Sequence, residues 1–435
     1  MFPNPHDALP LPPRPSLEQY KKRAKDLLQA NQSLNPTAVR DWATHWIDSL
    51  VRLSDLTITP QLPVRVEHWA DQLDQFARRK LSETTTLAAA QFVVARAQGF
   101  ESWPQLAQHV EATGRANSPV SHFELAADAI VNGETAMLEP VLREHPDLIR
   151  ARSTRRHQAT LLHYISANGV EGYRQKTPNN IWQIAELLLR AGADVNAVAD
   201  VYGGSTTLAL VATSLHPERA GAQNALLQLL LDRGATLDPV ACSAKLIVTA
   251  CLANGRVQAA EFLAQRGARL DLEGAAGLGR LDVVETLLDE SSPAPASPTI
   301  QIERALLWAC EYGRNPVIEF LLRRGVPLQS MADTGQTALH WAVIGGHLDT
   351  INLLRQRGAS LEAKNAYGGT ALGQALWSAL YSDDGMKYLP AIETLLKAGA
   401  PIEPGTLKWL AEQKPVSSQA TQNIATLLRN HGASS

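Results

Sequence analysis

The feature that most constrains this chain is a leucine-rich segment that ends in a glycine turn and recurs along most of its length. The glycine of this segment falls at seven positions: Gly192, Gly234, Gly267, Gly325, Gly358, Gly399 and Gly432. The intervals between them are 42, 33, 58, 33, 41 and 33 residues, so 33 is the basic period. The interval of 58 holds one more copy, LDVVETLLDES, with Ser291 in place of the glycine. A fixed period of this length predicts stacked repeats instead of a single compact core.

A second motif keeps the same period. Residues 337–342 read TALHWA, with a glycine two positions before them and another four positions after. Residues 160–163 read TLLH, and looser copies start at Thr206 and Thr370. The 33-residue period and the T-P-L-H-x-A pattern are those of ankyrin repeats. Over roughly residues 123–435 the chain therefore resembles the ankyrin-repeat family.

The resemblance implies an all-α fold, a solenoid of helix-turn-helix units joined by β-turn fingers. In the clearest unit, 338–345 is a small apolar first helix, and 348–356 is a second helix with Leu353 and Leu354 on its apolar stripe. Gly358 follows, where a left-handed residue ends the helix. One unit cannot bury its apolar face alone, so stability requires stacking. We count eight units and a terminal cap, which begin near Ser121, Thr154, Val201, Val240, Leu270, Thr299, Ala332, Asn365 and Gly405.

Three units carry insertions after their first helix. The inserted segments are 170–180, about 213–221 and about 378–387. Insertions in repeat proteins map to loops on one face of the solenoid, and we expect these three to do so.

One unit is short instead. About nine residues are missing between Gly267 and Leu272, so one finger is absent there. The sequence SSPAPASPT at 291–299 indicates a flexible linker on the other side of the same unit. Because each repeat contacts only its neighbours, we predict two semi-independent blocks, about 121–270 and 299–435, joined at a weak seam.

The first 114 residues lack the 33-residue period. Six prolines predict a disordered leader over 1–15, and residues 16–114 are predicted to form a small helical domain, followed by the solenoid over 121–435. Start and stop signals place five helices at about 16–30, 36–53, 64–80, 85–97 and 102–112, with capping boxes at Ser16 and Ser102 and an opening residue at Thr85. Two segments, PSLEQYKKRAKDLL and AAAQFVVARAQGFESWPQLAQHVEA, resemble a module at the front of bacterial ankyrin-repeat proteins, which implies a bacterial source.

Composition excludes several classes of protein. The net charge is −3, which gives no general attraction for nucleic acid or an acidic membrane. The N-terminus lacks the basic start and apolar core of a secretory signal, and no apolar run reaches the roughly 18 residues of a membrane span. The 3 cysteines form no paired motif, which fits a reducing compartment and predicts neither a metal site nor a cofactor. We therefore expect a cytoplasmic protein.

The residues best suited to chemistry have structural interpretations. His163 and His340 stand in the repeat motif, where the resemblance implies that the histidine bonds backbone groups and braces the finger. Cys251 and Cys310 take positions where ankyrin repeats carry alanine, so we expect small, buried, unreactive thiols, with Cys242 more exposed. The sequence contains no phosphate loop, catalytic carboxylate pair or metalloprotease motif, and we predict that the chain is not an enzyme.

The resemblance implies a binding surface on the concave face, made by the fingers and the exposed sides of the first helices. We expect a monomer that uses this face to bind another protein, because tyrosine and tryptophan are enriched at interface hot spots. The positions expected to face outward are Arg156, His157, Asn168, Tyr202, Ser205, Glu311, Tyr312, Asp333, Gln336, Tyr367 and Trp377. No motif identifies the partner, and neither a membrane nor nucleic acid is the expected one.

Two alternatives remain open at this point. The helical domain could bind nucleic acid or a second partner through Lys21, Lys22, Arg23 and Lys25, although a solvated helix face is the simpler interpretation of that run. An affinity for DNA that falls with salt would favour this role. The helical domain could also hide an enzyme site, which would require a pocket holding a pKa-shifted carboxyl or histidine.

Overall fold

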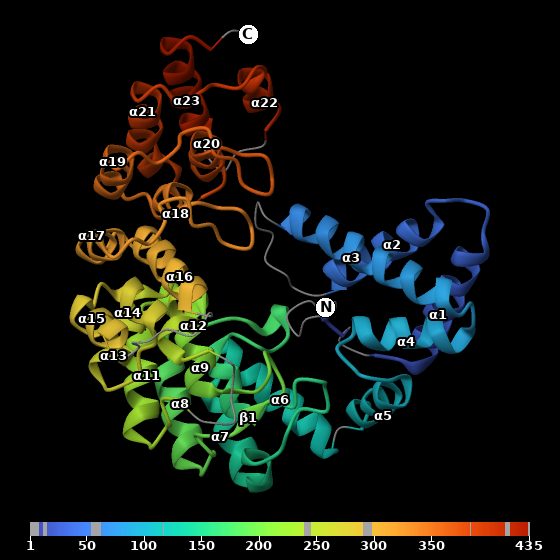
Figure 1. Ribbon diagram of the computed structural model, residues 1–435. Coiled ribbons are helices and arrows are strands. Elements are labelled where there is room, and N and C mark those ends of the chain that lie inside the picture. The colour runs from blue at the N-terminus through green and yellow to red at the C-terminus, as the bar shows by residue number, and fades with distance from the viewer. Residues whose placement is uncertain are drawn as a thin grey trace. The chain divides into compact units, whose positions relative to one another are not determined.

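The computed structural model describes residues 8–11, 15–53, 62–115, 117–238, 245–289, 298–382, 384–413 and 418–433. The chain forms two compact units, Met1–Leu263 and Ala264–Ser435. Both are built almost entirely of short helices, as expected (Figure 1). The division falls within the predicted solenoid and not between the helical domain and the repeats.

The N-terminal helical region contains the five expected helices. They are α1 (Leu17–Gln32), α2 (Ala38–Leu53), α3 (Leu62–Glu83), α4 (Leu87–Ala97) and α5 (Trp103–Thr113). Their apolar stripes form one core around Trp46, Leu73 and Phe100, each at most 1% exposed. The predicted caps were wrong in detail. Thr86, not Thr85, caps α4, and the side chains of Ser16 and Ser102 make no cap hydrogen bond.

Part of the leader is ordered, against the expectation of disorder over 1–15. Ala8 is 5% exposed and Leu9 is 3% exposed, and Leu9 belongs to the core of the helical region. The Leu9 N–H donates a 2.8 Å hydrogen bond to the carbonyl oxygen of Ala97. The apolar pair Ala8 and Leu9 is therefore held at the C-terminal end of α4, where a helix carbonyl is free to accept a hydrogen bond from outside the helix. Residues 1–7 and 12–14 lie outside the described part of the chain.

The rest of the first unit consists of helix pairs. They are α6 (Pro119–Asn132) with α7 (Thr135–Glu144), η3 (Leu161–Ser166) with α8 (Ile181–Arg190), α9 (Thr207–Thr213) with α11 (Gln223–Asp232), and α12 (Ile247–Ala253) with α13 (Val257–Gln265). The first helix of the second pair is a 3₁₀ helix. One finger carries two antiparallel strands, β1 (Val198–Ala199) and β2 (Ser205–Thr206), with Val198 opposite Thr206.

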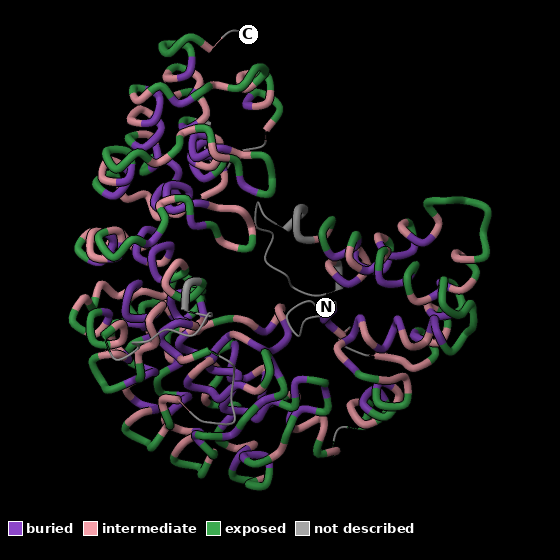
Figure 2. Tube along the Cα trace, viewed as in Figure 1, coloured by how far each residue is buried: buried purple, intermediate pink, exposed green. Residues whose placement is uncertain are grey.

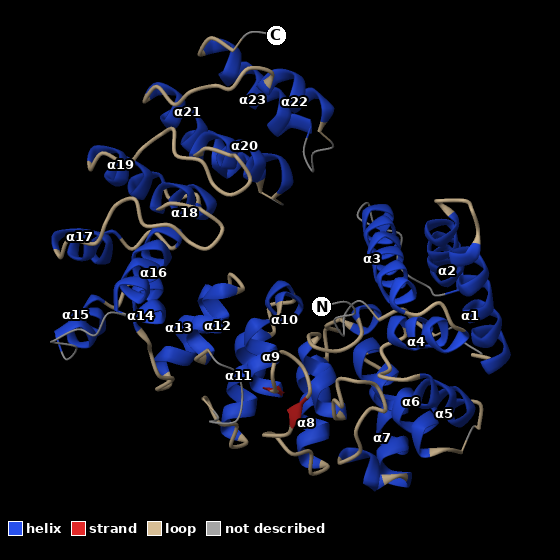
Figure 3. Cartoon of the chain, turned by 45° about the vertical axis from the view of Figure 1, so that its right-hand side comes forward, coloured by secondary structure: helices blue, strands red, loops and turns tan. Residues whose placement is uncertain are grey.

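The second unit continues the same pattern. Its pairs are α14 (Leu272–Leu278) with α15 (Leu281–Asp289), α16 (Pro298–Glu311) with α17 (Asn315–Arg323), α18 (Ala338–Gly345) with α19 (Leu348–Gln356), α20 (Ala371–Tyr381) with α21 (Leu389–Lys397), and α22 (Thr406–Glu412) with α23 (Ser418–Asn430). The first helices from α14 to α20 stand in one row, and the second helices from α15 to α21 stand in another (Figure 3). Buried positions follow the faces where neighbouring helices meet (Figure 2).

The motif histidines brace the fingers as expected. His340 Nδ1 accepts a 3.3 Å hydrogen bond from the Thr337 N–H, while its Nε2 lies 3.1 Å from the carbonyl oxygen of Gly369 in the next finger. His163 makes the same contacts with Thr160 and with the Ala197 carbonyl at 3.1 Å. Burial lowers the pKa of His163 to about 4, so the ring is neutral and can accept at one nitrogen and donate at the other.

The insertions are more structured than loops. They contain η4 (Gly172–Arg174), α10 (Leu215–Arg219) and η5 (Gly385–Tyr388). The first insertion folds inward instead of standing on the surface, because Val170 and Glu171 are 0% exposed and Arg174 is 4% exposed. The expectation of surface loops was therefore wrong for 170–180.

The short repeat belongs wholly to the second unit. Helix α14 begins at Leu272 as predicted, and Asp271 caps it by accepting a 2.7 Å hydrogen bond from the Gly274 N–H. Ala275 and Val284 are 0% exposed within the core of that unit. The boundary between the two units thus precedes this helix pair. Of the predicted linker at 291–299, residues 291–297 lie outside the described residues, and residues 298–299 form the start of α16.

We expect Leu354→Ala to lower the free energy of unfolding by about 2–5 kcal/mol, because Leu354 is 0% exposed and its truncation leaves a cavity. Leu348→Ala removes the same atoms from a side chain that is 37% exposed on the same helix, and should change stability far less. Urea unfolding followed by circular dichroism measures both. Equal effects of the two substitutions would show that α19 does not bury the face assigned to it.

Candidate functional site

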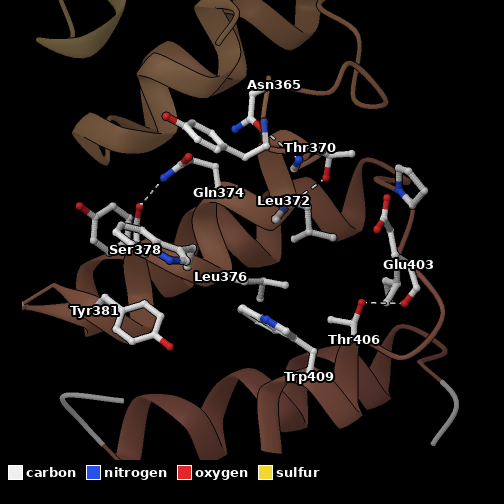
Figure 4. Close-up of a pocket in the computed structure, with 18 of the residues that line it drawn as sticks. Asn365, Thr370, Leu372, Gln374, Leu376, Ser378, Tyr381, Glu403, Thr406 and Trp409 are labelled. Atoms are coloured by element: carbon white, nitrogen blue, oxygen red, sulfur yellow. Dashed lines mark hydrogen bonds between the residues drawn. The ribbon is translucent and has the colours of Figure 1, made fainter. Parts of the chain in front are cut away.

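The second unit contains a cavity of about 1010 Å³. It lies between the finger at 365–370 and the finger at 401–406, with α20 along its length and Trp409 of α22 facing it (Figure 4). We call it the α20 groove. Glu403 and Thr406 stand at one end of the close-up and Tyr381 at the other.

The finger at 365–370 is a turn held by one side chain. Asn365 Oδ1 accepts hydrogen bonds from the N–H groups of Tyr367 at 3.0 Å and Gly369 at 2.9 Å. Gly368 has a φ of +78°, which favours glycine at this point of the turn. The turn leaves Tyr367 80% exposed beside the cavity. Thr370 then caps α20 by accepting a 3.2 Å hydrogen bond from the Gly373 N–H.

Aromatic side chains line the groove. Trp377 is 55% exposed, and its ring centroid lies 5.2 Å from that of Tyr381, one helical turn further along α20. The Tyr381 hydroxyl donates a 2.6 Å hydrogen bond to Gln413 Oε1, which ties the ring to the end of α22. Tyr388, supplied by the third insertion, is buried, and its hydroxyl donates to the Ile344 carbonyl at 3.1 Å. The Tyr381 and Tyr388 rings are therefore held in place by hydrogen bonds within the unit.

The groove carries almost no charge. Among the described residues that line it, Glu403 is the one with a charged side chain, and its carboxylate lies 2.5 Å from Lys364 Nζ. The remaining polar groups are hydroxyls and amides. Gln374 and Ser378, for example, are joined by a 3.2 Å hydrogen bond along α20.

The groove gathers three of the predicted partner residues, Gln336, Tyr367 and Trp377. Others lie on the surface elsewhere. Tyr202 is 53% exposed, Asp333 is exposed beside Arg304 at 3.5 Å, and Arg156 is exposed with Glu101 at 3.7 Å. Partial burial is found for Asn168, Glu311 and Tyr312. Burial raises the pKa of Glu311 to about 7.

Two predicted partner residues are buried, and their assignment was wrong. Ser205 is 6% exposed, and its hydroxyl donates a 3.2 Å hydrogen bond to the Val201 carbonyl inside its own finger. His157 is 3% exposed, its Nδ1 accepts from the Ala159 N–H at 3.1 Å, and its Nε2 lies 3.5 Å from Glu171. Both side chains serve the folding of a finger and are not available to a partner.

His157 lies at the edge of a buried ionic cluster that the sequence did not predict. Arg155 is 1% exposed, pairs with Glu171, and donates a 2.9 Å hydrogen bond to the Gln98 carbonyl of the helical region. Arg174 pairs with Glu124 at 2.8 Å. Burial alone would raise the pKa of the Glu171 carboxyl, but Arg155 and Arg174 outweigh it and hold that pKa well below its usual range. Ion pairs therefore join α6, the first insertion and the finger that carries Arg155, and a hydrogen bond joins that finger to the helical region.

The thiols of Cys251 and Cys310 are both 0% exposed, as expected. Burial raises the pKa of Cys251 to about 12, and its sulfur donates to the Ala212 carbonyl at 3.5 Å. Cys242 lies outside the described residues. Within the described ranges, no group of three or more His, Cys, Asp or Glu side chains could hold a metal ion. No described helix is both long and apolar enough to cross a membrane.

Two residues of the basic run on α1 make contacts within the helical region, whereas Lys22 and Lys25 are exposed. Lys21 pairs with Glu18 at 2.7 Å, and the Arg23 guanidinium lies 5.0 Å from the centre of the Trp46 ring. These contacts agree with long basic side chains whose stems pack on the core of the helical region and whose charged ends face solvent.

Comparison with known proteins identifies the repeats of the second unit. A family model described as ankyrin repeats (3 copies) matches residues 272–365 and again 306–404. Both matches lie within the second unit, and the match to residues 306–404 includes most of the residues that line the α20 groove. No curated protein matches the chain significantly.

We expect Glu171→Gln to lower the free energy of unfolding by about 3–5 kcal/mol, because it leaves two buried guanidinium groups short of a partner. The folded-state pKa of Glu171 is depressed, so its contribution is complete well above about pH 4.3 and is lost as the pH falls below that value. The difference in the free energy of unfolding between wild type and Glu171→Gln should therefore become smaller as the pH falls below about 4.3. Asp282→Asn breaks an ion pair in solvent and should leave urea unfolding unchanged; a similar response from both variants would contradict the role assigned to the cluster.

We expect neither Cys251 nor Cys310 to react with an aromatic disulfide reagent in the folded protein, because the reactive species is an exposed thiolate and both thiols are buried. Both should react once urea unfolds the chain. The measurement is made in a Cys242→Ser background, so that only these two thiols are counted. Rapid labelling of either thiol in the native state would show that its helix opens readily.

Proposed function

This chain is an ankyrin-repeat protein, and we propose that it binds a segment of another protein in the α20 groove. Ankyrin repeats are in general protein-interaction modules. The observation that carries the proposal is the exposure of Tyr367 and Trp377, at 80% and 55%, on the rim of a cavity of about 1010 Å³. Large aromatic side chains left exposed beside a preformed concavity are typical of interface hot spots.

Two further observations support this site over the other predicted positions. Two aromatic side chains of the groove are held by hydrogen bonds within the unit, Tyr381 to Gln413 and Tyr388 to Ile344, so these two lose little side-chain entropy on binding. The predicted positions in the first unit include two buried side chains, His157 and Ser205. The proposed role is binding without a catalytic step, by a monomer in the cytoplasm.

The test is capture of partners by the full chain and by two variants. Tyr367→Ala with Trp377→Ala removes the exposed rings of the groove, and each truncation should weaken binding by about 2 kcal/mol or more, close to 30-fold. Trp182→Ala is the matched control, because Trp182 is 42% exposed on α8 and is not one of the residues that line the groove. Captured proteins are quantified by mass spectrometry.

Proteins retained by wild type and by the control but lost from the double variant would support the proposal. An identical captured set for all three chains would place binding elsewhere. The circular dichroism of each variant should match that of wild type, because neither exposed ring contributes to the buried core.

A further inference from the structure

The proposed function leaves the chemistry of the bound segment open. Resting on that function, we propose that the α20 groove takes an uncharged, proline-containing segment in the extended polyproline II conformation. Three properties of the groove lead to this class of partner: its exposed aromatic rings, its lack of unpaired charge, and its hydrogen-bond donors that meet no acceptor among the described residues.

The first property is the arrangement of rings. Trp377 and Tyr381 lie one turn apart on α20, with their ring planes tilted by 43°, and Tyr367 stands exposed on the neighbouring finger. The Trp377 and Tyr381 rings pack against each other, and together with Tyr367 they give the groove aromatic faces on which a flat ring can pack. Proline-rich segments dock in aromatic-lined grooves, because the pyrrolidine ring packs flat on an aromatic face and the stiff chain has little entropy to lose.

The second property is electrostatic. Glu403 is the single carboxylate on the described lining of the groove, and Lys364 already pairs with it at 2.5 Å. A basic segment would find no free counter-ion there, and an acidic segment would meet one carboxylate and no cation on the lining. The groove is therefore complementary to a neutral segment.

The third property is the direction of hydrogen bonding. A polyproline II chain has no internal hydrogen bonds and its prolines have no N–H, so it offers carbonyl acceptors and few donors. The indole N–H groups of Trp377 and Trp409 can only donate, and neither meets an acceptor within the described residues. The Ser382 hydroxyl is buried at the same groove and also has no partner in the described part of the chain.

A helical partner fits the groove less well. An α-helix satisfies its carbonyls internally, so it would leave these donors unused. Helices also bind through a continuous apolar strip, whereas the polar side chains of Thr370, Gln374 and Ser378 lie along the groove together with Leu372 and Leu376 (Figure 4). The donors and the polar positions favour an extended segment.

The experiment titrates the full chain with a short peptide of Pro-Pro-Leu repeats, followed by tryptophan fluorescence and calorimetry. Peptides of the same length serve as comparisons: an alanine-rich helical peptide, oligoglutamate and oligolysine. We expect the proline peptide to bind most tightly. Trp377→Ala should weaken it by roughly 30-fold or more, and Trp182→Ala should leave the affinity unchanged.

Two conservative variants test the donor argument separately from the rings. Trp377→Phe and Trp409→Phe keep an aromatic face and remove the N–H, so each should weaken the proline peptide by roughly 2- to 10-fold. Wild-type affinity in both phenylalanine variants would overturn the assignment of these donors. Tighter binding of the helical peptide or of either charged peptide would overturn the proposed class of partner.

The outcomes separate this inference from the function on which it rests. Protein capture that depends on Trp377, together with no binding of the proline peptide, would overturn the inference and leave the binding role of the groove intact. Protein capture that Trp377→Ala does not change would contradict both this inference and the proposed binding role of the groove. Concentration-dependent dimerisation abolished by Trp377→Ala would also overturn it, because a second copy of the chain would then be the occupant.

Discussion

The structure depends on one constraint, which is that a pair of short helices cannot bury its apolar face without a neighbour. The fingers help to enforce the stacking that results. The Ala366 N–H donates to the Thr334 carbonyl at 2.9 Å, and the Asp200 N–H donates to the His157 carbonyl at 2.8 Å, so one finger is bonded to the next. The same bridge extends into the helical region, where the Arg156 N–H donates to the Gly99 carbonyl at 3.0 Å. The turn between α4 and α5 is therefore bonded to the finger that carries Arg156, and the buried Arg155 reinforces that junction.

The regular parts of the fold could be predicted because their residues act over short distances in the chain. In the Thr–His motif the two hydrogen-bond partners, Thr337 and His340, are only three residues apart. The bracing role of His340 therefore follows from the motif alone. The buried stripe of a helix follows from its period, which places Leu354 at 0% exposure and leaves Leu353 partly buried. Start and stop signals located the five helices of the helical region, although the capping side chains differ from those expected.

The errors concern residues whose environment is made by segments distant in sequence. His157 and Arg155 stand in a finger and would be exposed in a regular repeat, but an insertion brings Glu171 to them. Leu9 stands among prolines and has no local reason to be ordered; its position is set by the end of α4. For the groove, the repeat pattern identified Gln336, Tyr367 and Trp377, which belong to regular positions. It did not identify Tyr381, Tyr388 or Trp409, because an insertion and the last repeat supply them.

This origin explains why the groove lies where it does. Helix α18, in the most regular repeat, has 8 residues, whereas α20 has 11. The additional turn carries Tyr381 and leads to Ser382, and the rest of the insertion returns through η5, which places Tyr388 under Ile344. A regular first helix ends instead at a glycine, as α18 does at Gly346. It therefore has no aromatic side chain at the position that Tyr381 takes in α20. Stacking demands only the buried stripe of each helix, so a lengthened helix and an added turn can be accommodated without disturbing the core. The departures from the repeat are therefore the places where a binding surface specific to this chain can form, and the α20 groove is formed at one of them.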